Sequence, residues 1–545
     1  MKKRNTIFLL IISMLLILAA CSSDDKSDNS ADGNSTDSDV VKISVFSQQN
    51  STLDLETNWF SNHVEEKFNV DFEWQTTTWD PTAAAEARSI AMASGDYPDM
   101  FLLIPWVDQF SQAELVNYGK QGALIPLNDL IKEHAPNIQK VLDEHEYYAA
   151  MATAPDGNIY GLPQLNECFH CMWNTKMWMN KTWLDTLGLD IPTTHEELEV
   201  VLEAFKNEDP NGNGKQDELP VSGAAGLIDG GDIITFLMNG YIYDDAVTRL
   251  IVEDGKVDFA PNKPEWREGL MYIRGLYEKG LIDPGTFSQN QDALYQIGGA
   301  EETILGSTVI VHPAMFATDL EIHNQYEPVP PLQGPNGAWT KYEYASKPGG
   351  TFVLTNKASE EVQIAAIKII DYLFTEEGKI QGENGQEGIG WMRPEEGDVA
   401  INEDVEPIVK QIPLAEGEEE RNDSWGPLSQ YYHPVEFRDG LVQDLDIYSP
   451  NGYERRLQEA TYLYEDKHPE EVYPHWAVWY DVDIIDELSM MRTNIDDYID
   501  QNAVQFITGE KSLETDWDDY VEGFERLGLE RYLEIMQEAF DNAKF

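Results

Sequence analysis

The chain has 545 residues, and its 37 Lys and Arg against 99 Asp and Glu give a formal net charge of −62. This charge excludes nucleic acid as the main partner, because binding a phosphate backbone needs clustered cations that displace counterions. Apolar residues make up 42% of the sequence and aromatic residues 11%, which excludes a disordered polyelectrolyte and, at this length, favours two or more lobes over one core.

The first residues are typical of an export signal. A short basic segment precedes an almost unbroken apolar run at residues 6–18, which is too short and ends too abruptly for a membrane-spanning helix. The run leads into Leu-Ala-Ala-Cys, which resembles the lipobox of bacterial lipoproteins, in which Cys21 carries a diacylglyceryl thioether and becomes the mature N-terminus. We therefore predict a lipoprotein signal peptide over residues 1–20, with an ordinary signal peptide and a chance cysteine as the alternative.

The segment after the signal peptide has a composition that keeps it in water. Residues 22–39 hold six Ser and six Asp, so they have no apolar face to bury. We expect residues 21–39 to be a tether between a lipid anchor on the extracellular face of the cell membrane and the folded protein.

Strand-like and helix-like segments alternate after the tether. Expected strands are residues 40–46, 70–75 and 100–104, and expected helices are residues 59–68 and 83–93. This order is typical of a mainly parallel sheet with helices on both faces. In such sheets ligands gather beyond the carboxyl ends of the strands. The first candidate ligand contacts are therefore the residues that follow the first and third strands: Gln48, Asn50, Trp106 and Asp108.

Three later helices have recognisable first residues. Thr194 can cap a helix in which Glu197 reciprocates the capping bond. Ser359 and Thr515 precede further stretches whose apolar residues repeat at helical spacing. We expect each helix to bury one apolar face.

Residues 209–218 have the spacing of a calcium loop. The sequence Asp-Pro-Asn-Gly-Asn-Gly-Lys-Gln-Asp-Glu places oxygen donors at alternate positions and glycines where the backbone must turn sharply. Ca²⁺ prefers about six to eight oxygen ligands, and the loop matches the first half of the EF-hand pattern. It departs from the second half, because the twelfth position is Pro220 and Glu218 stands two residues earlier. A hydrophilic Asn-Gly turn is the alternative, and an ion held by this one segment would be structural rather than catalytic.

Six segments together resemble the large lipoprotein branch of the extracellular solute-binding proteins that serve ABC importers of oligosaccharides. In chain order they are residues 95–99, 156–163, 183–189, 209–220, 506–509 and 527–532. Each segment alone is weak, but their order extends over nearly the whole mature chain behind a lipobox.

The resemblance implies an α/β, two-lobed fold of the periplasmic-binding-protein type (class II), which closes around its ligand by hinge bending. By analogy, crossovers between the lobes are expected near residues 160–163, 300 and 347–350. Lobe 1 would then comprise residues 40–160 plus about 300–346. Lobe 2 would comprise residues 161–299 plus about 347–545, including the calcium loop.

The same resemblance implies a structural Ca²⁺ ion held by the loop. Its ligands would be Asp209, Asn211, Asn213, Lys215, Asp217 and Glu218.

The Cys168-Phe169-His170-Cys171 segment departs from the resemblance. It could be a redox pair or half of a zinc site. However, no second close cysteine pair supplies further zinc ligands, and a redox pair needs its cysteines at the start of a helix. Two free thiols or a short-range disulfide are therefore favoured, and the three cysteines of the chain exclude a disulfide scaffold.

The chain has 14 tryptophans, and a sugar site pairs aromatic planes with polar groups that bind the hydroxyl rim. Three of them occupy loop settings that suit such a platform: Trp106, Trp339 and Trp391. Four others are expected to pack in cores: Trp59, Trp74, Trp183 and Trp517.

These observations favour a monomeric cell-surface lipoprotein that captures an oligosaccharide between two lobes and delivers it to the permease subunits of an ABC transporter, without catalysing a reaction. Alternatives are a surface-anchored carbohydrate-active enzyme, a receptor of the same fold for a peptide or another solute, and an adhesion protein. Ligand-induced closure requires contacts to both lobes, since a ligand that touches one lobe shifts no equilibrium.

Overall fold

The structure is a computed structural model that describes residues 40–225, 231–344, 346, 349–414 and 418–543. The expected signal peptide, the lipid-bearing Cys21 and the tether lie outside the described residues. The chain divides into two units, Met1–Val40 and Val41–Phe545, and all described helices and strands belong to the second. Within the described ranges, no helix combines the length and the apolar composition that a membrane crossing requires.

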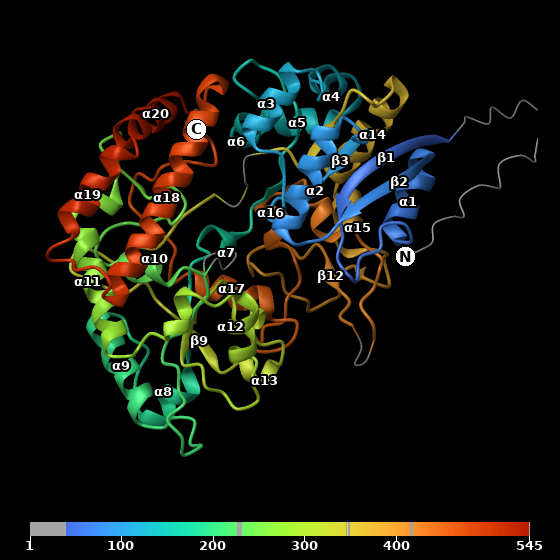
Figure 1. Ribbon diagram of the computed structural model, residues 1–545. Helices are drawn as coiled ribbons and strands as arrows, with labels where there is room; N and C mark the ends of the chain where they lie inside the picture. The colour runs from blue at the N-terminus through green and yellow to red at the C-terminus, as the bar shows by residue number, and fades with distance from the viewer. Residues whose placement is uncertain (1–39, 226–230, 345, 347–348, 415–417, 544–545) are drawn as a thin grey trace, which may run out of the picture. The chain divides into compact units, whose positions relative to one another are not determined.

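The first sheet has four strands in the order β10-β3-β1-β2. Its strands β1, β2 and β3 are labelled in Figure 1. The strands are β1 (Val41–Gln48), β2 (Val70–Thr77), β3 (Met100–Leu102) and β10 (Phe352–Leu354). β1 pairs in parallel with β2 and β3, whereas β10 is antiparallel to β3. Parallel neighbours need a crossover between them, and helices supply it here.

The two crossover helices of this sheet begin at residues that cap them. In α1 (Trp59–Phe68), the Asn58 side chain accepts hydrogen bonds from the amides of Phe60 and Ser61. In α2 (Pro81–Ser94), Asp80 accepts from the amide of Ala83. Such bonds satisfy amides that lack a partner in the first helical turn. The strands and helices expected between residues 40 and 104 are confirmed.

The remaining elements are α-helices of 4 to 24 residues, short strands and 3₁₀ helices of three or four residues. The α-helices are α3 (Gln112–Lys120), α4 (Asn128–His134), α5 (Pro136–Glu144), α6 (Glu146–Ala152), α7 (Phe169–Met172), α8 (Lys181–Leu187), α9 (His195–Asn207), α10 (Ile233–Met238), α11 (Pro264–Glu278), α12 (Gln291–Gly298), α13 (Leu320–His323), α14 (Glu360–Leu373), α15 (Glu376–Asn384), α16 (Val435–Asp439), α17 (Tyr453–Thr461), α18 (Ile485–Thr508), α19 (Trp517–Arg526) and α20 (Leu529–Asn542). The strands are β4 (Leu165–Asn166), β5 (Met177–Asn180), β6 (Leu250–Glu253), β7 (Lys256–Phe259), β8 (Ser307–Val309), β9 (Tyr326–Val329), β11 (Trp391–Met392), β12 (Lys410–Gln411) and β13 (Tyr432–His433). The 3₁₀ helices are η1 (Ala260–Asn262), η2 (Pro284–Phe287), η3 (Pro313–Met315), η4 (Gly426–Ser429) and η5 (Val482–Ile484).

The first core is the cluster of buried side chains from the first sheet, α1, α4, α5 and α14. α14 begins at Ser359, whose side chain accepts from the amide of Val362, as expected. Its apolar face, which includes Ile369 and Ile370, is fully buried. Asp371 on the same helix accepts from the amides of Asn137 and Ile138 at 2.8 and 2.9 Å. It thereby supplies the acceptors that α5 lacks at its own N-terminus.

The second core surrounds a three-stranded sheet in the order β8-β5-β9, in which β5 is antiparallel to both neighbours. Buried side chains from α8 to α11 and from α18 to α20 pack in this core. α9 begins at Thr194, whose side chain accepts from the amide of Glu197, so the expected start is confirmed. Glu197 itself accepts from the amide and hydroxyl of Thr193.

The expected start of α19 at Thr515 is wrong. Asp516 occupies the capping position, and its side chain makes no cap to the helix. The Asp516 carboxylate instead accepts from the amide of Ser512 at 2.8 Å, while the Thr515 hydroxyl donates to Asp516. The turn before the helix therefore uses the side chains that would otherwise cap it.

The two cores divide the chain differently from the expected lobes. Val309 and Val329, expected in lobe 1, are buried in the second core. Phe352 and Leu428, expected in lobe 2, are buried in the first core. The physical reason is strand pairing, because β8 and β9 flank β5 whereas β10 joins β3. The chain accordingly passes between cores at residues 165–173, 332–352 and 431–464, rather than near residue 300.

Candidate functional site

A cavity of about 1050 Å³ is lined by side chains from segments that are distant in the sequence. Gln109 reaches it from the loop that follows β3 of the first sheet. Trp266 of α11 and side chains of α18 from Ile499 to Gln505 line it from elements of the second core. Trp476 and the connecting residues Lys341, Glu343, Tyr344 and Ser346 complete the wall. The cavity thus combines side chains that belong to both halves of the fold.

Aromatic side chains form part of the cavity wall. Trp476 packs edge-on against Tyr342 with 5.6 Å between ring centroids, and Tyr344 stacks on Tyr147 at 5.1 Å. Trp266 is fully buried, and its indole N–H has no partner among the described residues. A buried donor without an acceptor is costly, so this N–H is a candidate contact for a ligand oxygen.

A buried charge cluster lies in the same wall. The Arg249 guanidinium pairs with Asp244, with Asp232 at 3.4 Å and with Asp500 at 3.9 Å. Burial opposes its charge, but the Asp244 and Asp232 carboxylates outweigh burial and hold the pKa of Arg249 above its usual value. Asp232 also caps α10, where it accepts from the amides of Ile234 and Thr235. The helix start and the ion pairs therefore fix the orientation of this carboxylate.

A second polar group lines the cavity around Glu343. Its carboxylate accepts from Asn174 Nδ2 at 2.7 Å and lies 3.3 Å from Lys341 Nζ and 3.6 Å from His475 Nε2. These planar and charged groups beside aromatic rings can bind a ring of hydroxyls on a largely apolar body.

Gln48 and Asp108, two of the expected ligand contacts, support the fold next to the cavity. Gln48 Nε2 donates to the Asp108 carbonyl at 3.0 Å, and its Oε1 accepts from the Ile104 amide at 2.6 Å. The Asp108 carboxylate accepts from Arg88 Nε and Nη2 at 2.7 and 3.0 Å. Neither side chain lines the cavity, but both hold the loop that carries Gln109 to it.

The expected contact Asn50 forms a local turn. Its Oδ1 accepts from the amides of Thr52 and Leu53 at 3.0 and 2.8 Å and from the Thr52 hydroxyl. Asn50 does not line the cavity.

The three tryptophans expected as a sugar platform also lie outside the cavity wall. Trp106 is 36% exposed and packs edge-on against Trp79. Trp391 is 3% exposed, and its indole donates to the Gly385 carbonyl at 3.0 Å within a small cluster beside α15. Trp339 is half-buried, and its amide donates to Asn239.

The four tryptophans expected in cores do pack there. Trp183 and Trp517 are buried in the second core, and Trp59 and Trp74 pack against the first. Sequence reasoning missed the aromatic residues of the cavity wall, of which Trp266 lies in the first turn of α11. The one available signal was the aromatic-rich run at residues 473–480, which has no regular period.

The loop at residues 209–218 turns its side-chain oxygens toward its own backbone. Asn211 Oδ1 accepts from the Asn213 amide at 3.0 Å, and Asn213 Oδ1 accepts from the Lys215 amide at 2.7 Å. The Asp209 carboxylate accepts from the Gly214 amide at 3.1 Å. The turn requires a φ of 76° at Gly214, which a residue with a side chain rarely adopts.

Glu218 closes this loop with a carboxylate that is 8% exposed and whose two oxygens have no partner among the described residues. Burial raises the pKa of its carboxyl, and the Asp209 and Asp217 carboxylates raise it further. Buried carboxylates are normally paired or bound to a metal. The donor set therefore fits a hard cation such as Ca²⁺. The Lys215 ammonium lies 3.0 Å from Glu302, so this residue would offer only its carbonyl.

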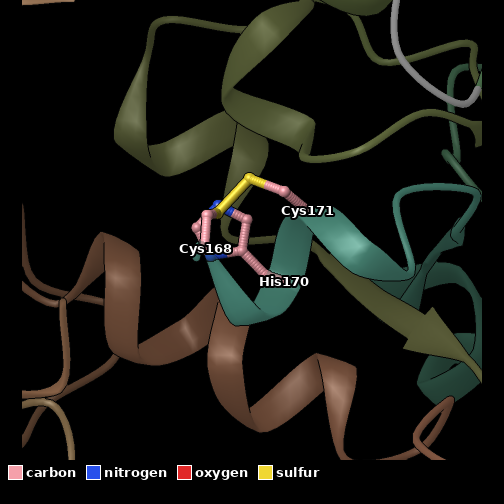
Figure 2. Close-up of side chains that lie close together, drawn as sticks. All are labelled: Cys168, His170 and Cys171. Carbon is pink, nitrogen blue, oxygen red and sulfur yellow. A yellow bond between two sulfur atoms is a disulfide. The ribbon is translucent and has the colours of Figure 1, made fainter. Parts of the chain in front are cut away.

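Cys168 and Cys171 form a disulfide, one of the two favoured expectations (Figure 2). His170 lies beside it, with Nε2 at 3.2 Å from Cys168 Sγ and Nδ1 at 3.6 Å from a Glu454 oxygen. Burial lowers the pKa of His170 to about 4. In this oxidised form the sulfurs offer no thiolate to a zinc ion.

Comparisons with known proteins agree with these features. A family model described as bacterial extracellular solute-binding protein matches residues 54–380. The chain is 29% identical over 521 residues to the fructooligosaccharide ABC transporter substrate-binding protein FusA of Streptococcus pneumoniae serotype 4, covering 92% of this chain and 90% of that protein. It is 26% identical over 325 residues to lipoprotein LipO of Bacillus subtilis, covering 57% of this chain and 60% of LipO.

Solved structures show the same fold. The structure of Streptococcus pneumoniae FusA in complex with kestose has a TM-score of 0.71 at 27% identity, covering 92% of this chain and 99% of that chain. An extracellular solute-binding protein from Bifidobacterium longum subsp. infantis has a TM-score of 0.76 at 20% identity, covering 92% and 98%. The expected α/β, two-lobed fold of the periplasmic-binding-protein type is confirmed.

Proposed function

Because the chain belongs to the bacterial extracellular solute-binding proteins, we propose that it captures an oligosaccharide in the cavity of about 1050 Å³ and delivers it to the permease of an ABC importer. The observation that carries this proposal is that aromatic rings and oriented polar side chains lie together in the wall of one cavity. The likeness to FusA over nearly the full length of both chains supports it.

The size and composition of the cavity favour an oligosaccharide. Small-molecule pockets range from about 300 to 1,000 Å³, and the volume of this cavity, about 1050 Å³, slightly exceeds that range. Trp266 and Trp476 offer apolar faces for the C–H groups of sugar rings. The carboxylates of Asp232 and Glu343 and the guanidinium of Arg249 offer acceptors and donors for hydroxyls.

Capture requires that the ligand stabilise a closed state more than an open one. Gln109 is carried by the first sheet, whereas Trp266 and α18 belong to the second core. A sugar that contacts both sets of residues would favour closure, and movement at the three chain passages would supply the hinge. No bond of the ligand is broken in this cycle.

A binding experiment tests the proposal with a matched pair of variants. Isothermal titration calorimetry with a panel of fructooligosaccharides and other neutral oligosaccharides should show reversible binding without release of shorter products. Trp476→Ala should lower the affinity for the best-binding oligosaccharide at least tenfold, which is equivalent to about 1.4 kcal/mol of binding free energy. Trp391→Ala removes an equally buried tryptophan that lies outside the cavity and should leave the affinity unchanged.

Two outcomes of that experiment would contradict the proposal. Release of shorter products in the absence of a permease would indicate a carbohydrate-active enzyme. Equal affinities of the Trp476→Ala and Trp391→Ala variants would place the ligand elsewhere.

We also propose a structural Ca²⁺ ion in the loop at residues 209–218. The oxygens of Asp209, Asn211, Asn213, Asp217 and Glu218 and the carbonyl of Lys215 would hold it. The bond from Asn213 Nδ2 to Asp217 Oδ1, 3.0 Å long, would be replaced by contacts to the ion. The unpaired carboxylate of Glu218 supports this assignment, and one solved FusA structure is described as an EF-hand mutant.

The anchoring proposal rests on the sequence. A lipidated Cys21 followed by a tether would hold the monomeric protein at the extracellular face of the cell membrane, where it can reach the permease. Two or more acyl chains hold a soluble domain firmly, at about 0.8 kcal/mol per buried CH₂. Radiolabelled palmitate should be incorporated by the wild-type chain and not by Cys21→Ala.

A further inference from the structure

A second cavity of about 320 Å³ lies where α13 and the start of α17 meet the segment that joins β8 to η3. Its wall includes His312, His323, Ser449, Tyr453 and Arg456. It shares no lining residue with the larger cavity. Two buried nitrogen atoms in its wall have no hydrogen-bond partner in the part of the chain that the structure describes.

The first is Nε2 of His312, a side chain that is 1% exposed. The Ala314 amide donates to His312 Nδ1 at 2.9 Å, so Nδ1 is the acceptor and Nε2 carries the hydrogen of the neutral ring. Burial, together with the positive charge of Arg456, lowers the pKa of His312 to about 2, which keeps the ring neutral. Nε2–H is therefore a buried donor without an acceptor among the described residues.

The second is Nε of Arg456, a side chain that is 3% exposed. Its other nitrogens donate to neutral oxygens, Nη1 to Asn324 Oδ1 at 2.9 Å and Nη2 to the Tyr326 carbonyl. Arg456 makes no ion pair with any carboxylate among the described residues. The carboxylate that raises the pKa of Arg456 is that of Glu327, which accepts a hydrogen bond from the Tyr448 hydroxyl at 2.5 Å.

Two further basic side chains are close enough to act on this wall, and burial lowers the pKa of both. Lys176 is completely buried, and its amino group donates to the carbonyls of His170 and Trp173. His323 donates from Nδ1 to the Ala317 carbonyl at 2.9 Å, which leaves Nε2 to accept or, when protonated, to donate. The Asp319 carboxylate, which caps α13, raises the pKa of His323. Arg456 is therefore the permanently charged side chain of this wall, and no acidic residue of the described ranges lines the cavity with it.

We propose that this cavity binds a small oxyanion, held by Nε–H of Arg456 and Nε2–H of His312. Inorganic phosphate and a small carboxylate share the required chemistry, which is a pair of oxygens that accept two hydrogen bonds and carry negative charge. Hydrogen bonds in which one partner is ionised are roughly twice as strong as neutral ones. Water could accept both bonds, but it would leave the guanidinium without a counter-charge. The hydroxyls of Ser449 and Tyr453 lie in the same wall and can contact the anion.

The test uses the full chain in buffer containing EGTA, so that any effect is independent of the calcium loop. Inorganic phosphate and acetate are titrated separately by calorimetry and thermal shift, with chloride at matched ionic strength as the reference. We expect phosphate or acetate to raise the melting temperature and to bind at one site, and chloride to do neither. The anion that binds more tightly shows whether the site prefers a tetrahedral oxyanion such as phosphate or a planar carboxylate such as acetate.

Two histidine variants make the test specific. His312→Asn keeps an oxygen that can accept from the Ala314 amide but removes the Nε2–H donor. It should lower the affinity for the anion at least tenfold. His195→Asn alters an equally buried histidine outside this cavity and should bind the anion as the wild type does. Neither variant should change the affinity for oligosaccharide, which separates this site from the larger cavity.

If the His312 variant fails to fold, Arg456→Lys retains the charge while removing Nε–H and should show the same tenfold loss. The inference is overturned if chloride stabilises the protein as well as phosphate and acetate do. It is equally overturned if the folded His312→Asn variant binds the anion with wild-type affinity.

Discussion

Replacing Glu218 by Gln should change the stability of this protein in opposite directions with and without calcium. The substitution keeps the shape of the side chain and removes its negative charge. Without an ion, the ionised carboxylate is buried close to those of Asp209 and Asp217, and neither of its oxygens has a hydrogen-bond partner among the described residues. An unsatisfied buried group costs about 1–3 kcal/mol, and more when it is charged. In EGTA, Glu218→Gln should therefore be at least as stable as the wild type.

Calcium should reverse that order. An ion present at about 100 times its Kd stabilises the folded state by about 2.7 kcal/mol. For a cooperative unit of about 150–250 residues, each kcal/mol raises the melting temperature by about 2–4 °C. The wild type should therefore gain roughly 5–10 °C with calcium. The variant, which lacks the charged oxygen that closes the loop, should gain much less.

Differential scanning calorimetry in EGTA, in magnesium and in calcium measures these shifts. The control is Glu302→Gln, which removes an exposed carboxylate that pairs with Lys215 at 3.0 Å, and this variant should respond to calcium as the wild type does. Magnesium should stabilise less, because it prefers a rigid octahedral shell and retains its waters. The reasoning is refuted if calcium leaves the wild-type melting temperature unchanged, or if Glu218→Gln responds as fully as the wild type.

Three further predictions concern buried groups. The folded pKa of His170 is about 4 and that of His312 about 2, so the unfolded chain takes up protons first. The free energy of unfolding in urea should then fall as the pH drops below about 6.5, by up to about 1.4 kcal/mol per pH unit for each ring, and a flat profile would contradict this. Burial lowers the pKa of Lys176 to about 7, so stability should rise with pH between about 7 and 10.5, and Lys176→Met should remove this dependence. In denaturant, the thiols of Cys168 and Cys171 should become titratable only after reduction, and their detection without reductant would refute the disulfide.

Local sequence patterns were sufficient for several features. The alternation of residues in β1, the capping residue Ser359 and the composition of the loop at residues 209–218 depend on neighbours within a few positions. Hydrogen bonds from caps and side-chain periodicity act over one turn of helix or one pleat of strand. A sequence window therefore contains all the interacting groups. For Cys168 and Cys171, which are three residues apart, the same window left two free thiols or a disulfide open, and the structure contains the disulfide.

The pairing partners of the later strands could not be predicted from local sequence patterns. β10 pairs with β3 across about 250 residues of chain, and β5 lies between β8 and β9. These pairings placed Val309 and Val329 in the second core and Phe352 and Leu354 in the first, opposite to the expected lobes. Sequence neighbours do not encode which distant strand completes a sheet edge.

The candidate site shows the same division. The sequence selected the loop after β3, but it named Asp108, which pairs with Arg88, whereas the adjacent Gln109 lines the candidate cavity. It likewise selected Trp391, whose surface is covered by a small cluster beside α15. Whether a tryptophan faces a core or a cavity depends on which distant side chains cover it. The sequence by itself thus predicted the first strands and helices and the caps at Thr194 and Ser359, because these interactions are local. Only the tertiary structure decided which side chains remain uncovered, because burial is a property of the whole packed chain.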